Sequence, residues 1–213
     1  MVMRNLKAIA LLSWIALSIS CGTIPPYSSF NKQPVTGFYT VKAKTAAFSG
    51  TDLSETNTNT NIVSESEIND TSSYAIEIER IFKEQISTTF SIHKREYRTE
   101  PSNDWAINGN QIHVGVRRYF GDRALTGFLA LEGIYTFNFN DPEKDLDYLS
   151  GPGWALGAGI NFSIDENTSI ESSLFYESIT PANSYSSGDT SSPSDFEHSL
   201  KGVIGYIGVG YHF

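Results

Sequence analysis

Ionisable side chains recur at every second position in several short stretches, and this spacing limits the chemistry they can do. Lys42 and Lys44 form one such pair, and Glu77 and Glu79 form another. Residues two apart in a β-strand share a face. Opposite charges that share a face can pair with each other. The residues that alternation assigns to this face are Lys42, Lys44, Glu77, Glu79, His93, Arg95, His113, Arg117, Glu132, Glu171, Glu177 and His212.

The charges of this set nearly balance, with four Lys or Arg residues against five Glu residues. We therefore expect a network of ion pairs on this face. Arg117 and Glu132 fall on neighbouring predicted strands and are possible members. The alternative for each residue is that it faces a water pocket without a partner.

Catalytic and metal-binding patterns are not evident. His198 and Ser199 come nearest to a base and a nucleophile, but adjacent residues of a strand point to opposite faces. The other histidines, His93, His113 and His212, lack metal-ligand spacing and are expected to form hydrogen bonds. The sequence shows no phosphate loop, nucleotide fingerprint or paired cysteine motif. We expect neither enzymatic activity nor a cofactor.

Alternation of apolar and polar residues predicts the elements that position these side chains. A period of two residues is typical of β-strands, and Leu125 to Phe139 has the longest such pattern. A strand of that length fits an oblique membrane crossing. The predicted strands span about 35–44, 74–83, 86–97, 110–120, 125–139, 153–164, 168–179 and 196–213.

Short and long connections alternate along the chain. The segment 49–73, rich in Ser, Thr and Asn, is expected to be a solvated loop. In an up-and-down barrel this alternation places all short turns at one rim and all long loops at the other. The short connections are about 83–85, 121–124 and 165–167, and the long ones are about 44–73, 98–109, 140–152 and 180–195.

Aromatic residues lie near the ends of the apolar faces, as in the two girdles of a membrane barrel. The alternative is that they are ordinary core aromatics. In a bilayer the apolar face meets lipid and the charges turn inward. The sequence thus predicts an all-β fold, an eight-stranded antiparallel up-and-down transmembrane β-barrel. The expected girdles are Phe82, Phe120, Phe162 and Phe213 near the short turns, and Tyr39, Phe139, Trp154 and Tyr176 near the long loops.

The N-terminus has the order of an export signal, with Arg4 and Lys7 before an apolar run at 8–19. Leu-Ser-Ile-Ser-Cys at 17–21 resembles a bacterial lipobox, which predicts lipidation at Cys21. The alternatives are cleavage by ordinary signal peptidase and a free thiol. The expected organisation is a signal peptide at 1–20, a tether at 21–34 and a barrel at 35–213.

Without the signal peptide, 13 basic residues face 24 acidic ones, a formal charge of −11. Nucleic acid phosphates attract the opposite sign of charge. A nucleic-acid partner is therefore not expected.

The hairpin IHVGVRRYFGDRALTGFLALEGIYTF at 112–137 and the ending GVGYHF resemble the small outer-membrane β-barrels of Gram-negative bacteria. This group contains the membrane domain of outer membrane protein A and many porin-family proteins. The resemblance implies residence in the cell outer membrane as a monomer among lipid and lipopolysaccharide. It also implies that Gly208, Tyr211 and Phe213 form a signal for the barrel assembly machinery. The chain departs from outer membrane protein A in that no peptidoglycan-binding domain is expected after the barrel.

Three functions remain open on the sequence. The first is a structural or surface-interaction barrel with a mostly plugged interior, because eight strands leave little lumen. The second is a narrow pore, which glycines such as Gly157 and Gly159 could widen locally. The third is a lipid-anchored lipocalin-like binding protein, suggested faintly by TGFYTV at 36–41.

Overall fold

The computed structural model describes most of the region predicted to form the barrel. The predicted signal peptide, the tether and Cys21 lie outside the described residues. These are 39–57, 59–68, 70–83, 85–98, 107–121, 125–141, 146–165, 167–180, 183–186, 189–193 and 196–213.

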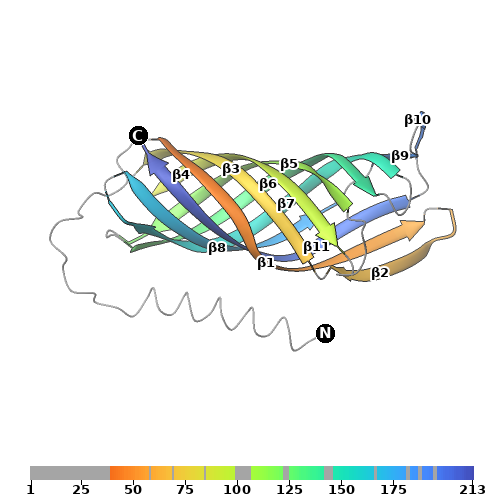
Figure 1. The fold of residues 1–213 in the computed structure, drawn as a ribbon, viewed down its shortest axis with the longest axis horizontal. Coiled ribbons are helices and arrows are strands. Elements are labelled where there is room, and N and C mark those ends of the chain that lie inside the picture. Colours follow the sequence, from red (N-terminus) through yellow and green to blue (C-terminus); the bar gives the residue numbers. More distant parts are fainter. Residues whose placement is uncertain are drawn as a thin grey trace.

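Eight long antiparallel strands form a closed barrel within this part of the chain (Figure 1). Three short strands lie outside the barrel cycle, namely β2 (Ile62–Ile68), β9 (Asn183–Ser186) and β10 (Asp189–Pro193). The barrel strands are β1 (Tyr39–Asn57), β3 (Asp70–Lys83), β4 (Ile86–Arg98), β5 (Ile107–Phe120), β6 (Leu125–Asp141), β7 (Leu146–Ser163), β8 (Thr168–Ile179) and β11 (Phe196–His212).

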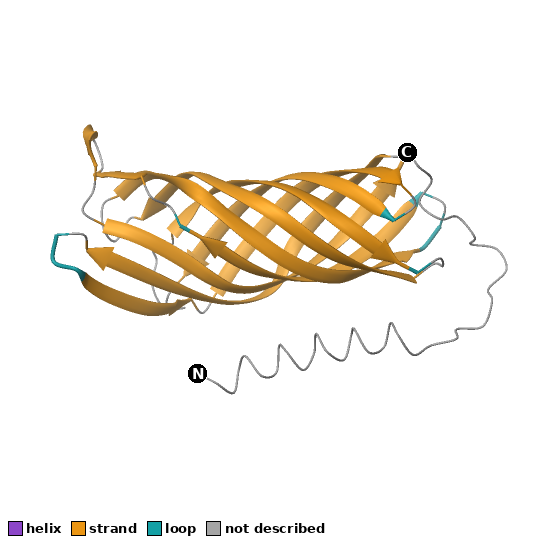
Figure 2. Cartoon of the chain, turned by 180° about the vertical axis from the view of Figure 1, so that it is seen from behind, coloured by secondary structure: helices purple, strands orange, loops and turns teal. Residues whose placement is uncertain are grey.

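Each barrel strand pairs with the barrel strands that precede and follow it in the sequence, and β1 pairs with β11 to close the cylinder. The closing register runs from Thr40 opposite His212 to Asn57 opposite Phe196. Closure gives every barrel strand two partners, so backbone groups at membrane depth are satisfied. Figure 2 shows the barrel from behind, formed of strands throughout. No helix of the described part is long and apolar enough to cross a membrane.

The outer wall is apolar, and the inner wall carries the charges. Ile76, Leu131 and Val209 are more than half exposed, at 64%, 54% and 54%. Lys42 and Arg117, by contrast, are each 1% exposed. Water would not stabilise such an outer surface, whereas hydrocarbon does. An apolar belt around a closed barrel is the architecture of outer-membrane proteins, and it assigns the chain to the outer membrane.

The two rims differ as the connection lengths predicted. The C-terminus and the short periplasmic turns share one end of the barrel, and β2, β9 and β10 lie at the other, external end (Figure 1). There β1 and β11 continue beyond the last β7 to β8 pair, Gly153 and Ile179, to form an extension with β2.

The expectation of a solvated loop at 49–73 was wrong. Residues 49–57 continue β1, and β2 folds back on it with Asn57 opposite Ile62. Polar composition does not exclude a strand, because Thr suits strands and β11 supplies backbone partners. Leu53 and Ile68, which are 2% and 1% exposed, anchor this part of the chain.

The expected external girdle needs two corrections. Tyr39 begins β1 at the short-turn rim, where its carbonyl accepts a hydrogen bond from Phe213 N at 2.9 Å. Phe139 is fully buried and faces inward. The ladder between β6 and β7 is irregular between Thr136 and Phe139, and Asn138 has a φ of 51°, so strict alternation ends there.

Trp154 and Tyr176 do face outward toward the external end, and their ring centroids are 5.7 Å apart. At the short-turn end Phe82, Phe162 and Phe213 are all exposed, and Phe120 is partly exposed. Aromatic rings at these levels match the two interfaces of a bilayer.

Candidate functional site: the barrel interior

A cluster of ionic side chains fills the part of the lumen nearer the short turns. Its members come from five strands, because alternation turns the same face of each strand inward. We call it the lumenal ion cluster. It consists of Lys42, Lys44, Glu77, Glu79, Arg117, Glu132 and Glu171.

Glu171 on β8 contacts all three cations of the cluster, as Glu77 on β3 also does. Its oxygens lie 2.6 Å from Lys42 Nζ, 2.8 Å from Lys44 Nζ and 3.0 Å from Arg117 Nη1. Three cations around one carboxylate offset the loss of hydration that burial imposes on each group. The contact with Arg117 spans three strand steps around the barrel, from β5 to β8.

The remaining carboxylates complete the cluster. Glu77 accepts from Lys44 and Arg117, each at 2.6 Å, and Glu79 lies 2.6 Å from Lys42. Glu132 is 3.5 Å from Arg117, so these two residues of adjacent strands lie together. Tyr119 and Ser87 both donate to Glu79, although neither is among the lumenal residues predicted above. Tyr119 follows Arg117 by two positions, and the alternation could have identified it.

A second ion pair crosses the lumen nearer the external end. Arg95 Nη2 donates to both oxygens of Glu177, at 2.7 and 2.8 Å. Their strands, β4 and β8, are four steps apart in the eight-strand cycle and are therefore opposite each other. Gln111 accepts from Arg95 Nε at 2.9 Å, and Tyr206 donates to Glu177 at 3.2 Å.

His93 and His113 connect these two groups. Their rings stack with centroids 3.9 Å apart and an interplanar angle of 17°. His113 Nδ1 lies 3.0 Å from Glu132, and its Nε2 lies 3.1 Å from Gln111. The polar column is thus continuous from the lumenal ion cluster to the Arg95 and Glu177 pair.

The two ends of the polar column have different surroundings. At the short-turn rim His212 Nδ1 is 2.8 Å from Thr40 Oγ1, and its Nε2 is 3.0 Å from Ser169. Apolar side chains fill the external end, a feature that the expectation of a charged lumen missed. We call them the external apolar cluster, which consists of Leu53, Ile68, Tyr97, Ile107, Phe139, Ile179 and Leu200.

The remaining candidate residues do not form a catalytic or metal site. His198 faces inward, 3.4 Å from Glu55, and Ser199 follows it on the opposite face of β11. A nucleophile and its base must lie within hydrogen-bond reach, and these two point apart. Within the described ranges, no three His, Cys, Asp or Glu side chains are arranged to hold a metal ion.

The three residues of the expected assembly signal lie on both faces of β11. Tyr211 and Phe213 face outward with ring centroids 5.1 Å apart. Gly208 faces inward, where a Cβ would lie 2.8 Å from Lys44 Cγ. Gly208 therefore makes room for a member of the lumenal ion cluster.

Side chains occupy the interior along its length. Its charged side chains join strands across the lumen at hydrogen-bond distance, and bulky apolar residues fill its external end. The charged lumen does not fit the apolar pocket of a lipocalin.

Solved structures with this fold include Neisserial surface protein A, with 12% sequence identity and a TM-score of 0.51, covering 84% of this chain and 98% of that one. The outer membrane protein OprG from Pseudomonas aeruginosa also has 12% identity and a TM-score of 0.51, covering 84% and 96%. No family model and no curated protein matches the sequence significantly. At such identities the likeness shows the fold, that of eight-stranded outer-membrane barrels.

Proposed function

We propose that this chain, which has the fold of the small eight-stranded outer-membrane barrels, is a non-conducting membrane anchor that presents an external interaction surface. The observation that supports a blocked lumen is the ion pair of Arg95 and Glu177, whose side chains meet at 2.7 Å from opposite strands. The lumenal ion cluster, nearer the short turns, and the external apolar cluster, nearer the external end, fill the lumen on either side of this pair. Eight strands leave no room for a channel beside such side chains.

Conductance in a planar bilayer tests the closed state. The refolded barrel should give no steady current. A combined variant with Arg95→Ala, Glu177→Ala, Arg117→Ala, Glu171→Ala and Phe139→Ala should admit water and small ions, because it removes side chains from all three levels that fill the lumen. Steady conductance of the unaltered protein would instead support the narrow-pore alternative.

An exposed pair of the same residue types provides the control. Arg98 and Glu96 lie at the external end of β4, where their side chains are 41% and 37% exposed and paired outside the crossing contacts. Replacing both with Ala should leave the barrel closed. Current from this control as well would show that the substitutions loosen the barrel without opening a defined lumen.

The extension of β1, β2 and β11 supports the interaction role. Ile62 and Val63, next to the turn between β1 and β2, are 65% and 54% exposed beyond the barrel wall. Exposed apolar side chains at a loop tip commonly mark contact sites. Replacing both with Ser should weaken binding of the refolded barrel to lipopolysaccharide-containing vesicles, measured by flotation. Equal binding would exclude these residues as the contact.

The processing and assembly predictions belong to the same proposal. The lipobox-like segment predicts that Cys21 incorporates labelled palmitate in the expressing cell and that Cys21→Ser does not.

The assembly signal predicts that Phe213→Ala lowers the amount of barrel in the outer membrane, whereas Phe213→Tyr restores it.

A further inference from the structure

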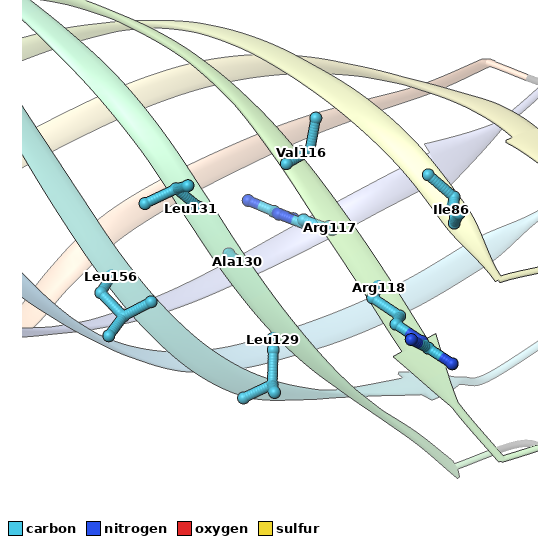
Figure 3. Close-up of a pocket in the computed structure, with 8 residues that line it drawn as sticks. All are labelled: Ile86, Val116, Arg117, Arg118, Leu129, Ala130, Leu131 and Leu156. Atoms are coloured by element: carbon cyan, nitrogen blue, oxygen red, sulfur yellow. The ribbon is translucent and has the colours of Figure 1, made fainter.

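Two arginines interrupt the apolar belt on one side of the barrel. Arg80 on β3 and Arg118 on β5 are exposed on the outer wall, near the short-turn end. Figure 3 shows that Arg118 points along the outside toward the end of its strand, whereas its neighbour Arg117 points inward. A charge on this wall meets lipid and not the polar lumen, so it needs a partner supplied by the membrane.

Both guanidinium groups are directed toward the periplasmic interface. The Cζ atom of Arg118 is 5.6 Å from the ring centroid of Phe120, and that of Arg80 is 5.0 Å from the ring centroid of Phe82. Each ring lies two residues nearer the short turn than its arginine. Long basic side chains extend in this way to place the charge at the headgroup level.

The two guanidinium groups have no acidic partner among the described residues. The ion pairs of the described residues lie in the lumen or at the external end, where Arg98 pairs with Glu96 and His198 with Glu55. The contacts of Arg80 and Arg118 are with aromatic rings. Their positive charge is therefore uncompensated by the part of the protein that the structure describes.

The strand register places the two arginines on either side of β4. Arg80 lies opposite Thr88, and Arg118 lies opposite Ile86. Two strand spacings separate the backbones by about 10 Å. Arg80 Cζ also lies 5.5 Å from the ring centroid of Tyr39 on β1, the neighbour of β3 away from β4, so Arg80 must turn across β3 toward β4 for one phosphate to lie between the two guanidinium groups.

A depression of about 290 Å³ adjoins Arg118 on the outer wall (Figure 3). Leu129 lies beside Arg118 in one cross-strand row, and Val116, Leu131 and Leu156 form the next row. The depression lies between these rows and crosses the strands. Its outward-facing lining is apolar apart from the arginine and can receive a segment of acyl chain. The outward-facing residues are Ile86, Val116, Arg118, Leu129, Leu131 and Leu156.

We propose that this face binds an anionic glycerophospholipid of the periplasmic leaflet, with its phosphate between Arg80 and Arg118 and one acyl chain in the depression. Charge complementarity favours a lipid with a net negative headgroup over a zwitterionic one. The depth of both arginines favours the leaflet at the short turns. An arginine and a phosphate form parallel, charge-assisted hydrogen bonds, which are strong where water is scarce.

Native mass spectrometry of the full barrel, refolded in mild detergent, tests the site. Phosphatidylglycerol and phosphatidylcholine with the same acyl chains are added in equal amounts, and the lipid retained by the protein is measured. We expect about tenfold preference for phosphatidylglycerol. Arg80→Gln and Arg118→Gln should each reduce this preference, and together they should abolish it.

Lys94→Gln is the matched control for charge. Lys94 is also exposed on the outer wall, but it lies on the external half of β4, opposite Tyr74 and Asn110. Its loss should leave the preference unchanged. An equal loss in this variant would show general attraction to the positive surface and would overturn the proposed site.

Leu129→Trp tests the place of the acyl chain by filling the depression without altering charge. It should lower retention of phosphatidylglycerol, while unboiled gel migration shows that the barrel remains folded. Glycerol phosphate, which has the headgroup chemistry without the chains, should not compete. Equal retention of the two lipids by the unaltered protein, competition by glycerol phosphate, or undiminished retention by Leu129→Trp would each overturn the proposal.

Discussion

At the residue scale, Glu171 shows how a charge can be buried inside a barrel wall. It is 1% exposed, yet three cations lie within 3.0 Å of its oxygens. A buried ion is costly unless it is paired, and removal of one carboxylate takes a contact from every cation that it touches. The stability of the cluster therefore depends on the complete set of partners more than on any single contact.

Glu171→Ala should destabilise the folded barrel by about 3–5 kcal/mol, because Lys42, Lys44 and Arg117 each lose a charge-assisted contact in a buried site. Reversible urea unfolding in lipid vesicles, followed by tryptophan fluorescence, measures this change. Glu96→Ala is the control, since Glu96 is partly exposed and exposed pairs contribute little. Equal stability of the two variants would contradict the role given to the lumenal ion cluster.

Gly109 is required by the residue opposite it. A Cβ at this position would lie 2.0 Å from Cδ2 of the inward-facing Phe139. Gly109→Ala should therefore cost about 1–3 kcal/mol through overpacking, and Phe139→Ala in the same chain should relieve that clash. Gly50→Ala is the control, because no heavy atom lies within 4 Å of a Cβ there. Urea unfolding compares the variants, and additive effects of Gly109→Ala and Phe139→Ala would contradict this packing.

At the scale of elements, the turn between β7 and β8 depends on one carboxylate. Asp165 Oδ1 accepts hydrogen bonds from Asn167 N at 2.8 Å and Thr168 N at 2.7 Å. These backbone donors, with Asn167 the stronger influence, hold the pKa of the Asp165 carboxyl below its ordinary value. A depressed pKa in the folded state means that the bonds stabilise the turn above the unfolded-state pKa. This contribution is lost as the pH falls through the folded-state pKa.

Hydrogen exchange at the Thr168 amide tests this dependence. In the unaltered protein, protection corrected for intrinsic exchange should fall as the pH drops from about 6 to about 2. Asp165→Asn retains an acceptor oxygen but does not titrate, so its protection should stay nearly constant over that range. Parallel profiles for the two proteins would show that the carboxylate does not control the turn.

The sequence predicted the strands best where they face lipid, because there one face is apolar and the other polar. In β6 the alternation runs unbroken from Leu125 until the irregularity after Thr136. Beyond the membrane both faces of a strand can be polar, and composition no longer distinguishes strand from loop. This is why the external part of β1 and all of β2 were missed, and why Phe139 was assigned to the wrong face.

The same alternation predicted which ionisable residues face inward but not which of them meet. Arg95 and Glu177 are distant in sequence and lie on opposite strands, so their contact depends on the closure and stagger of the whole barrel. Local periodicity contains no information about that stagger. The Arg117 and Glu132 pair was accessible to sequence reasoning because its strands are consecutive.

At the scale of the molecule, closure is the step on which every other feature depends. The pairing of β1 with β11 joins the two ends of the described chain, from Thr40 opposite His212 onward. This pairing provides hydrogen-bond partners for the last two free strand edges. It also completes the lumen around Lys42 and Lys44, which lie on β1. An open sheet would expose these buried charges to lipid, so partially closed forms should be scarce.

Closure predicts heat-modifiable migration that depends on the end of β11 and not on the external loop strands. After refolding from urea into detergent, without any assembly factor, the unboiled barrel should migrate apart from the boiled one. Deleting residues 203–213 removes the closing ladder from Thr40 to Gly50 and should abolish the shift. Deleting the same number of residues at 183–193, which contains β9 and β10, should preserve it, because these strands lie outside the barrel cycle. A shift that survives the first deletion, or is lost with the second, would mean that the compact form does not depend on the pairing of β1 with β11.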